Sequence, residues 1–491
     1  MITDFLNMID SYMYYPILII VLTIGGIWFS IRTKFVQIRL FPEAWRVLTE
    51  KPTEEGAVSS FQALMVSTAS RVGTGNIIGV STALCLGGPG AVFWMWVLAI
   101  LGSASAFIET TLAQIYKRRD EHLDGCYGGP AHYIEQALHN KALAIIFTIC
   151  LIATYGFGFN LLCSYNLQST FETYSFYNPD TTPMIIGLIV AALVALVIFG
   201  GGKSIAKITG VIVPVMGVVY VLVALFLILA HITYLPTVLK MIFTDAFDFQ
   251  AIGSGIAGSC LIYGIKRGLY SNEAGVGSAP NAAASADISH PVKQGLAAVI
   301  SVCIDTIFLC TATAFMCMMS GIKPTAEAAG AVYVQNSIQA SLGSFGPIYI
   351  TVAMALFAFT TLIGNLYYVD NGLKYLNHNT LPGKTFMIFW RILCALVVFV
   401  GAIISMDAAW AAADITMGLM ALINVPSCII LGKVAYKALK DYEEKKKAGK
   451  NPVFRASEIG LDPAQLDYWQ DGPSKFDGRE QDHLFHTEKA K

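Results

Sequence analysis

A glycine-rich segment carries polar side chains into an otherwise hydrophobic stretch of the chain. This segment, STASRVGTGNIIGVSTA at 67–83, has three glycines within seven residues and includes Asn76. In hydrocarbon, irregular backbone is tolerated only around a cavity or a bound ion. Gly75 and Gly79 also have the spacing of close helix packing, but the Asn76 carboxamide offers an oxygen to a cation where the backbone can open. We therefore expect a small ligand or ion to bind at this segment.

Two further segments have suitable chemistry. A second glycine cluster, AIGSGIAGSC at 251–260, opens another hydrophobic stretch, five stretches after the first. That spacing is typical of an inverted repeat, in which two discontinuous helices meet at the membrane midplane. Free amides at a half-helix N-terminus suit a carboxylate, and exposed carbonyls suit sodium, so an amino acid with a sodium ion fits both. Thr360 and Thr361, in FAFTTLIGN at 357–365, offer hydroxyl oxygens, although threonines in membrane helices often bond to their own backbone.

The elements that would position these groups are membrane helices. The 491-residue chain is 55% hydrophobic and only 13% charged, and its net charge of −1 gives no argument for a nucleic-acid partner. This composition argues against a soluble enzyme and predicts a lipid-embedded, all-α protein. We expect eleven spans, near 14–31, 58–86, 91–116, 142–170, 183–200, 205–231, 249–268, 292–320, 346–369, 385–405 and 409–436.

The positions of lysine and arginine predict the orientation of the chain. Alternate connections hold 17 basic residues, Lys266 and Arg267 among them, whereas the opposite connections hold only Lys240 and Lys323. Because basic loops stay on the cytoplasmic side, we expect a multi-pass protein of the cell (inner) membrane with its N-terminus outside and its C-terminus cytoplasmic. The stretch 33–50 predicts a short amphipathic helix on the inner face.

Several other functions can be weighed from the residue types. Asp305 and Glu109 are carboxylates inside predicted spans, so a proton-driven carrier that uses Asp305 as its relay stays open. The histidines show no zinc spacing and no catalytic dyad, and the cysteines predict buried reduced thiols. Without a convergent acid, base and nucleophile we expect no enzyme. A channel would need a continuous polar pore, and a receptor would need a folded sensor domain, for which the tail after Leu439 is too short and too polar.

At this point the sequence resembles a known family, the alanine or glycine:cation symporters, also called the sodium:alanine symporter family. The resemblance covers nearly the whole membrane region. GLYSNEAGVGSAP at 268–280 is its most specific part. The matching stretches are TKFVQIRLFPEAWRVL (33–48), RVGTGNIIGVSTAL (71–84), GGPGAVFWMWVLAILGSASAFIETTLA (87–113), YGGPAHYIEQAL (127–138) and GIKRGLYSNEAGVGSAPNAAASA (264–286).

The resemblance implies an inverted five-plus-five helix fold of the leucine-transporter type with one extra N-terminal helix. It implies the domains 1–57 (N-terminal span and amphipathic helix), 58–231 and 232–438 (five-helix repeats) and 439–491 (polar cytoplasmic tail, dispensable by default). It further implies a sodium-coupled importer of a small neutral amino acid that works by alternating access, with no organic cofactor. The free amino acid, Na+ and the lipid bilayer would be its partners, and we expect a monomer, although the sequence leaves the oligomeric state open.

Site residues carried over by motif fall into two groups. The implied sodium ligands are the carbonyls of Ala69, Val72 and Phe357 and the hydroxyls of Thr360 and Thr361. The implied substrate-binding residues are Val72, Gly73, Thr74, Gly75, Asn76, Phe157, Asn160, Gly255, Gly258, Ser259, Thr361 and Asn365, with the carboxylate near the Gly73–Gly75 amides.

Two departures from the family pattern concern the pocket. The family usually reads ILGW and then YYGE after the paired threonines, but this chain reads LIGN and YYVD, so Asn365 replaces tryptophan and Asp370 replaces glutamate. The family's FGIGNMVQ is only loosely kept as YGFGFNLLCS, at 155–164, without its glutamine. Loss of a large apolar wall suggests a roomier, more polar site, for which glutamine or asparagine are plausible substrates.

Overall fold

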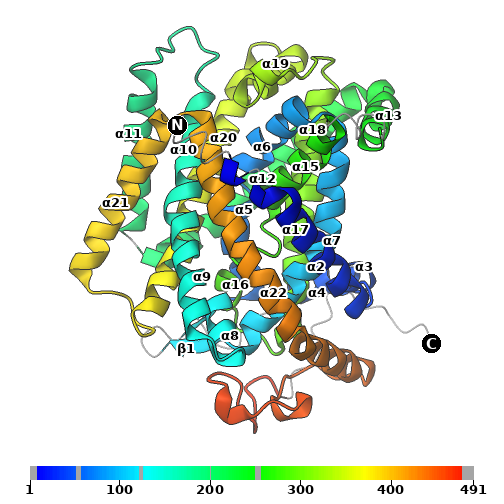
Figure 1. Ribbon diagram of the computed structural model, residues 1–491, viewed down its shortest axis with the longest axis vertical. Coiled ribbons are helices and arrows are strands. Elements are labelled where there is room, and N and C mark those ends of the chain that lie inside the picture. Colours follow the sequence, from blue (N-terminus) through cyan, green and yellow to red (C-terminus); the bar gives the residue numbers. More distant parts are fainter. Residues whose placement is uncertain are drawn as a thin grey trace.

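The protein is a bundle of long helices, closed at one end by its C-terminal segment (Figure 1). The computed structural model describes residues 8–10, 12–50, 57–120, 125–199, 201–248 and 256–477. Within this part of the chain, strands occur only in a two-stranded antiparallel hairpin, in which β1 (Arg118–Asp120) pairs with β2 (Gly125–Tyr127). We call the end that carries residues 451–477 the tail face and the opposite end the far face.

The helices follow one another in chain order. Their bounds are η1 Met13–Leu18, α2 Ile19–Arg32, α3 Val36–Arg39, α4 Phe41–Val47, α5 Ser60–Arg71, η2 Thr74–Asn76, α6 Ile78–Thr82, η3 Ala83–Gly87, α7 Gly90–Ile115, α8 Pro130–Ala137, α9 Lys141–Ala153, η4 Thr154–Gly158, α10 Phe159–Ser169, α11 Thr182–Ile198, α12 Gly201–Ala230, η5 Ile232–Tyr234, α13 Leu235–Ala246, α15 Ile256–Asn272, α16 Ala279–Ala283, α17 Pro291–Val302, η6 Cys303–Cys310, α18 Thr311–Met318, η7 Ala326–Ala328, α19 Ala331–Leu342, α20 Phe345–Leu376, α21 Lys384–Ile403, α22 Met406–Lys447, η8 Ser457–Ile459 and η9 Pro463–Gln465.

The hydrophobic stretches of the sequence form these helices. In the described part of the chain, seven are long and apolar enough to cross a membrane: Gly90–Ile115, Lys141–Ser169, Val211–Ala230, Pro291–Met318, Phe345–Leu376, Lys384–Ile403 and Met406–Lys447. Shorter apolar helices cover Ile19–Arg32, Thr74–Gly87 and Thr182–Ile198. Many large hydrophobic side chains are exposed on α11, α12 and α21, as expected of helices that face lipid. The chain is an all-helical membrane protein.

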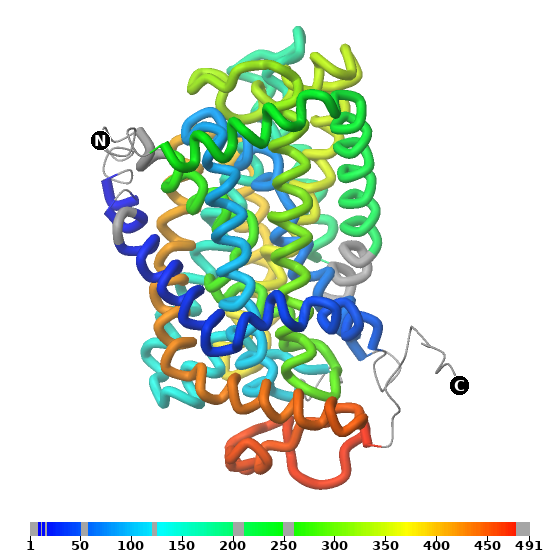
Figure 2. The backbone as a smooth tube through the Cα atoms, turned by 90° about the vertical axis from the view of Figure 1, so that its right-hand side faces the viewer, coloured from blue at the N-terminus to red at the C-terminus, as the bar shows by residue number. Residues whose placement is uncertain are grey.

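The predicted amphipathic helix at 33–50 is two short helices. Lys34 and Phe35 have φ of 55° and 54°, a left-handed conformation that separates α2 from α3, and α4 follows directly. Glu43 on α4 bonds the Tyr442 hydroxyl at 2.5 Å and the Lys446 ammonium. Glu43 therefore fastens the short helix α4 to the C-terminal end of α22. Helix α22 also packs against α2 (Figure 2).

Two basic residues lie on the other side from their predicted location. Lys266 and Arg267 are inside α15, toward the far face, where Lys266 pairs with Asp10 and Arg267 Nη2 lies 3.2 Å from Asp414 Oδ2. The assignment to a tail-face connection is wrong because the chain continues from Arg267 through a helix break and α16 before it reaches α17. The basic residues then divide 15 to four rather than 17 to two, which keeps the bias.

Candidate functional site

The first helix break lies at the glycine-rich segment 67–83. Helix α5 ends at Arg71, Val72 and Gly73 are non-helical, and the 3-10 turn η2 follows. The Gly73 N–H donates to Asn76 Oδ1 at 2.8 Å, so this side chain caps the turn it belongs to. The first N–H groups of a 3-10 turn, here those of Thr74 and Gly75, have no partner inside the turn, so they can receive an anionic group.

The second break lies at 273–278, between α15 and α16. Glu273, Gly275 and Gly277 have φ of 52°, 86° and 88°, and only glycine adopts such angles without strain. Of the glycine cluster at 251–260, only the residues from Ile256 onward are described, and they lie at the start of α15. Gly255 is outside the described residues, and Gly258 and Ser259 belong to the first turn of α15, about four turns before the break.

The two breaks touch each other at Tyr270. A Cβ atom added at Gly75 would lie 2.6 Å from the Tyr270 ring, so only glycine permits this approach. The Tyr270 hydroxyl is 3.4 Å from Thr74 Oγ1, which also accepts a 3.0 Å bond from Asn166 Nδ2. The Tyr270 ring packs between two other aromatic rings, those of Phe159 and Trp410, with centroids 4.7 and 5.0 Å away. The break is thus walled by aromatic rings and faced by hydroxyl and amide groups.

A buried carboxylate ties the two breaks together. Asp305, fully buried on η6, accepts bonds from Asn76 Nδ2 at 2.7 Å and from Ser271 Oγ at 2.6 Å. Thr306 Oγ1 adds a third donor at 2.9 Å. Because Asn76 belongs to the first break and Ser271 lies at the end of α15, directly before the second, Asp305 joins both in one hydrogen-bond network. Sequence reasoning had noticed this residue only as a proton relay.

Of the oxygens expected to hold sodium, those of Ala69 and Thr361 lie at the first break, whereas Thr360 Oγ1 lies 3.8 Å from Met216 Sδ on α12. Thr361 Oγ1 is 3.3 Å from the Ala69 carbonyl, and Thr360 Oγ1 is 3.1 Å from the Phe357 carbonyl. A Cβ atom at Gly73 would lie 2.1 Å from Thr361 Oγ1, which places α20 directly against the break. These are uncharged oxygen donors only, the set that a hard monovalent cation takes. The Thr360 hydroxyl also donates to carbonyls of its own helix, as threonines in membrane helices often do.

Asn365 connects three helices at the same depth. Its Oδ1 accepts a 2.6 Å bond from Ser70 Oγ, and its Nδ2 donates a 2.9 Å bond to Asn160 Oδ1. All three side chains are buried. Phe157, in contrast, turns toward α21, where its ring meets Trp390 at 6.0 Å. The structure therefore brings Asn160 and Asn365 to the first break and leaves Phe157 outside.

A second buried carboxylate supports the second break from the tail-face side. Glu109 accepts bonds from the Gly275 N–H at 3.3 Å and from Asn424 Nδ2 at 2.7 Å. Arg71, at the end of α5, interacts electrostatically with Glu109 and Glu273, and its guanidinium is buried without a direct hydrogen-bond partner among the described residues. Both breaks therefore have charged groups on this side.

Sequence reasoning missed several residues of the site. They are Tyr270, Ser271, Asn166, Phe159 and Trp410. The paired glycines of GLYSNEAGVGSAP were the available signal for the second break, since a G-x-G in a hydrophobic stretch predicts an interruption. The tyrosine and serine directly before that interruption then face the first break.

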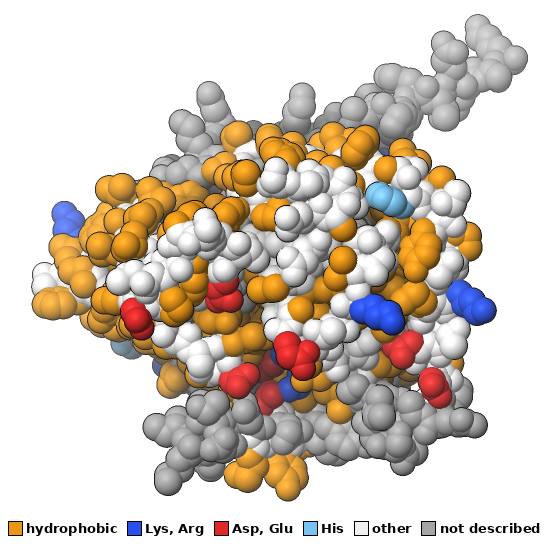
Figure 3. Space-filling view, turned by 90° about the horizontal axis from the view of Figure 1, so that it is seen from above, with side chains coloured by type: hydrophobic (Ala, Val, Ile, Leu, Met, Phe, Trp, Pro, Cys, Tyr) orange, Lys and Arg blue, Asp and Glu red, His pale blue; other side chains and the backbone are white. Residues whose placement is uncertain are grey.

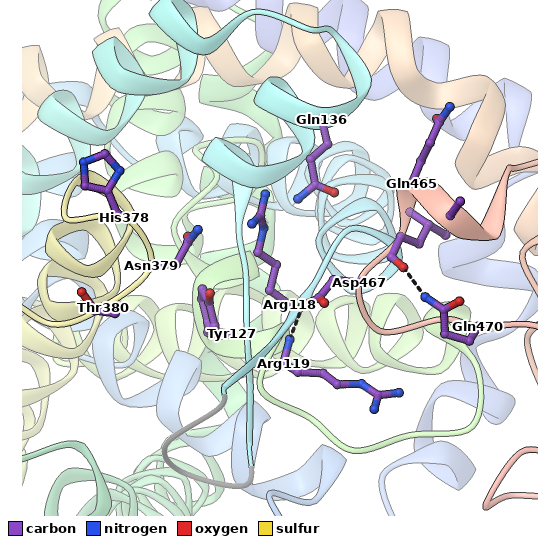
Figure 4. A pocket seen from close by; sticks show the side chains of 12 residues that line it. Arg118, Arg119, Tyr127, Gln136, His378, Asn379, Thr380, Gln465, Asp467 and Gln470 are labelled. Carbon is purple, nitrogen blue, oxygen red and sulfur yellow. Dashed lines mark hydrogen bonds between the residues drawn. The ribbon is translucent and has the colours of Figure 1, made fainter.

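A separate cavity of about 570 Å³ opens at the tail face. Arg118, Tyr127 and Gln136 form one side, and the 464–470 part of the C-terminal segment forms the other (Figure 4). None of the break residues lines it. This cavity therefore marks the edge of the docked C-terminal segment and is distinct from the site between the breaks.

A solved structure shares the fold of this chain. The crystal structure of MhsT in complex with L-phenylalanine superposes with a TM-score of 0.53 over 85% of this chain and 93% of that chain, at 14% identity. The fold is therefore that of MhsT, which is of the leucine-transporter type.

Sequence comparison identifies the family. The model of the sodium:alanine symporter family matches residues 1–456. A probable sodium/glutamine symporter, GlnT of Bacillus subtilis, is 42% identical over 91% of both chains. A putative sodium/proton-dependent alanine carrier of the same organism, YrbD, is 39% identical over 93% of this chain and 95% of that one. The chain belongs to the sodium:alanine symporter family, a family of transporters and not of enzymes.

Proposed function

We propose that this protein imports a small neutral amino acid together with sodium by alternating access. The observation that carries the proposal is the meeting of two helix breaks, at Gly75 and Tyr270, beside the sodium-type oxygens of Thr360 and Thr361. In this arrangement the substrate carboxylate binds the free amides of Thr74 and Gly75. Sodium binds next to it, between the Ala69, Val72 and Phe357 carbonyls and the two hydroxyls.

The proposed architecture has eleven spans. One N-terminal helix precedes two inverted repeats of five, with boundaries near 58–231 and 232–438, and the tail at 439–491 is cytoplasmic. The first break follows α5, at the start of the first proposed repeat, and the second follows α15, near the start of the second, which supports the inverted relationship. The scattered basic side chains on the far face agree with an outside location, since basic residues are retained inside (Figure 3).

Sodium binding and amino-acid binding are coupled in this proposal because both ligands contact the first break. Thr361 contacts the first break through Ala69 and Gly73, so bound sodium and bound amino acid act on the same segment. Each ligand then favours the closed arrangement that the other also needs, which is thermodynamic coupling between two sites. On the far-face side, Trp410 covers Tyr270, and Arg267 packs over the Trp410 ring at 3.5 Å. This stack serves as the outer cover of the site.

Glutamine or asparagine joins alanine and glycine in the proposed substrate range. Asn365 and Asn160 present amide groups at the depth of the first break, where a tryptophan would present an apolar wall. An amide side chain of the substrate can bond to such groups, which alanine leaves unused. The relative named as a sodium/glutamine symporter is consistent with this range.

A second candidate function is proton coupling through Asp305. The observation that favours it is the position of this buried carboxylate, bonded to both breaks. One relative named as sodium/proton-dependent keeps this alternative open.

Uptake into proteoliposomes separates these proposals. Radiolabelled alanine, glycine, serine, asparagine and glutamine are offered with an inward sodium gradient, with choline in place of sodium, and with an inward proton gradient. Sodium-dependent uptake that includes glutamine or asparagine is the expected result. Uptake that persists in choline and follows the proton gradient would replace the sodium proposal with the alternative. Sodium-dependent uptake of alanine and glycine, without uptake of glutamine or asparagine, would reject the wider substrate range.

A further inference from the structure

The C-terminal segment 451–477 is folded onto the tail face of the bundle. It contains many charged residues, yet seven of its apolar side chains are almost completely buried, in contrast to those of a solvated tail. These side chains are Val453, Phe454, Ala456, Ile459, Leu466, Trp469 and Phe476. The segment follows α22 and covers the bundle end (Figures 1 and 2).

Two side chains of this segment converge on one buried carboxylate. Tyr468 donates a hydrogen bond to Asp287 Oδ1 at 3.0 Å, and Lys475 Nζ lies 2.8 Å from the same oxygen. The backbone N–H of Asp287 in turn donates to the Val58 carbonyl at 2.8 Å. Asp287 lies four residues after α16 and Val58 two residues before α5. Asp287 therefore joins the tail-face ends of both broken helices, and the C-terminal segment holds Asp287.

Neighbouring contacts reinforce the same junction. The Trp469 indole donates to the Gln114 carbonyl at 2.7 Å, and the Gln114 amide donates to the Ala283 carbonyl, the last residue of α16, at 2.5 Å. The Phe454 N–H donates to the Ser289 carbonyl at 2.9 Å. The segment is thus bonded to the connection between α16 and α17 at two points along the chain.

Lys117 lies between the segment and the bundle. Its Nζ donates to the Ala286 carbonyl at 2.8 Å and sits 3.9 Å from the centre of the Tyr468 ring. Burial lowers the pKa of this ammonium to about 8, so covering it is costly. The Ala286 carbonyl and the Tyr468 ring are the contacts that offset this cost.

Docking is directed to this junction and does not cover the whole face evenly. On the other side of the segment, the 570 Å³ cavity separates residues 464–470 from the loop at 378–380 (Figure 4). The segment is therefore packed against the ends of the broken helices and stands away from the loop between α20 and α21.

We propose that segment 451–477 is a latch that keeps the tail-face exit of the transport site closed, with Asp287 as the positioning residue it holds. The inference rests on the proposed alternating-access cycle, in which α5 and α16 must move for the ligands to leave on this side. Moving either helix disturbs the Asp287–Val58 bond, and the docked segment adds its own bonds to that resistance. The latch therefore favours the state that is closed on the tail face.

Hydrogen exchange of the full-length protein tests the latch without depending on transport. The test variant combines Tyr468→Phe with Lys475→Met, which removes both bonds to Asp287. A second variant, Trp469→Phe, removes the indole bond but keeps an aromatic ring. Lys440→Met is the matched control for loss of one positive charge, because the Lys440 side chain is 78% exposed on α22.

Exchange is followed by mass spectrometry in peptides covering 58–66 and 279–290, with 406–414 as the far-face reference. We expect exchange about three- to tenfold faster in the two junction peptides of the test variants, with no change at 406–414 or in the control. Junction exchange equal to that of the wild type in both test variants would overturn the latch. Faster exchange at 406–414 as well would also overturn it, because it would indicate general loosening.

A transport measurement then connects the latch to the cycle. Since the latch favours the state closed on the tail face, its loss should raise the external sodium concentration for half-maximal uptake by about threefold or more. Faster junction exchange with an unchanged sodium dependence would reject the gating role. If neither the wild type nor any variant transports amino acids, the proposed function fails. The hydrogen-exchange result still decides in that case whether the segment fastens the junction.

Discussion

Asn76 donates a 2.7 Å hydrogen bond to the carboxylate of Asp305, although the two residues are 229 positions apart in the sequence. Asn76 closes the turn of the first helix break, and Asp305 also accepts a bond from Ser271 at the edge of the second. A movement of either break therefore changes the surroundings of this carboxylate. The pair gives the protein a direct link between the two halves of its site.

Replacing Asp305 by asparagine should impair both stability and transport. The amide keeps one oxygen for the Asn76 donor, but it places an NH2 group where the Ser271 and Thr306 hydroxyls donate, so these buried donors lose their acceptor. We expect a loss of about 1–3 kcal/mol in the free energy of unfolding and at least about a tenfold fall in uptake. Asp407→Asn, at an exposed position in the first turn of α22, is the control for the same chemical change. Unaltered sodium-driven uptake in Asp305→Asn would contradict the role of the pair.

Gly73 and Gly217 offer a matched test of close packing at the break. A Cβ atom at Gly73 meets Thr361 Oγ1 at 2.1 Å, whereas one at Gly217, within α12, has nothing within 4 Å. We expect Gly73→Ala to cost about 1–3 kcal/mol through overpacking and to abolish uptake. Gly217→Ala should leave uptake unchanged. Normal sodium-dependent transport by Gly73→Ala would mean that Thr361 does not need to lie against the break.

Thr361 is the residue through which sodium dependence can be tested most cleanly. Thr361→Ala removes the hydroxyl, and Thr361→Ser keeps it. We expect the alanine variant to need about tenfold more sodium for half-maximal uptake. A lost sodium ligand that contributes about 1.4 kcal/mol to binding changes the affinity by this factor. The serine variant should stay close to the wild type. The sodium titration is read at saturating amino acid, and equal curves for both variants would argue against a sodium ligand here.

Asn365 should decide how well amide side chains are accepted. Its own amide bonds Ser70 and Asn160, so Asn365→Ala removes two buried bonds beside the first break. We expect glutamine and asparagine to lose about tenfold in competition against labelled alanine, with alanine uptake less affected. A competition ratio that does not change in Asn365→Ala would assign selectivity to other residues.

The folded protein should lose stability at acid pH because of His290. Burial lowers the pKa of this imidazole to about 4, although its bond to Asp441 opposes the shift. An unfolded histidine takes up its proton near pH 6.5, so the unfolded state binds more protons between 6.5 and about 4, and stability falls as the pH falls through that range. The loss amounts to at most about 3 kcal/mol.

Thermal unfolding of the purified protein across this range measures the effect. His290 accepts the Val292 N–H at Nδ1 and so donates to Asp441 from Nε2, a geometry that only the neutral ring allows. His290→Gln should unfold at a lower temperature near neutral pH but show a flatter pH dependence. An equally steep dependence in His290→Gln would assign the acid sensitivity to another group.

The hydrophobic stretches were readable from sequence because a bilayer requires long apolar helices with satisfied backbones. The first break was readable for the same reason, since Gly73, Gly75 and Asn76 have no place in an uninterrupted apolar helix. The glycine cluster at 251–260 also predicted a break, but residues 251–255 lie outside the described part of the chain, so that prediction stays untested. Positive φ at Gly275 and Gly277 identifies an interruption within the described residues that the sequence analysis did not predict. The partnership of Asp305 with Asn76 depends on tertiary packing, which no local pattern encodes.

The C-terminal segment illustrates a second limit. Its charges suggested a solvated tail, but Phe454 and Trp469 are buried against the bundle. Aromatic residues spaced by polar ones form no periodic pattern from which burial could be predicted. Their docking depends on tertiary partners, such as the Gln114 carbonyl that accepts the Trp469 indole N–H. Sequence alone therefore predicted the position of the segment and not its packing.

Simultaneous measurement of sodium and amino-acid flux is the most direct test of the proposed symport. Proteoliposomes receive radioactive sodium and a labelled amino acid, and the entry of each is recorded with and without the other. The account predicts that the amino acid stimulates sodium entry in a fixed ratio and that Thr361→Ala lowers both together. Amino-acid entry that proceeds without any accompanying sodium would contradict it.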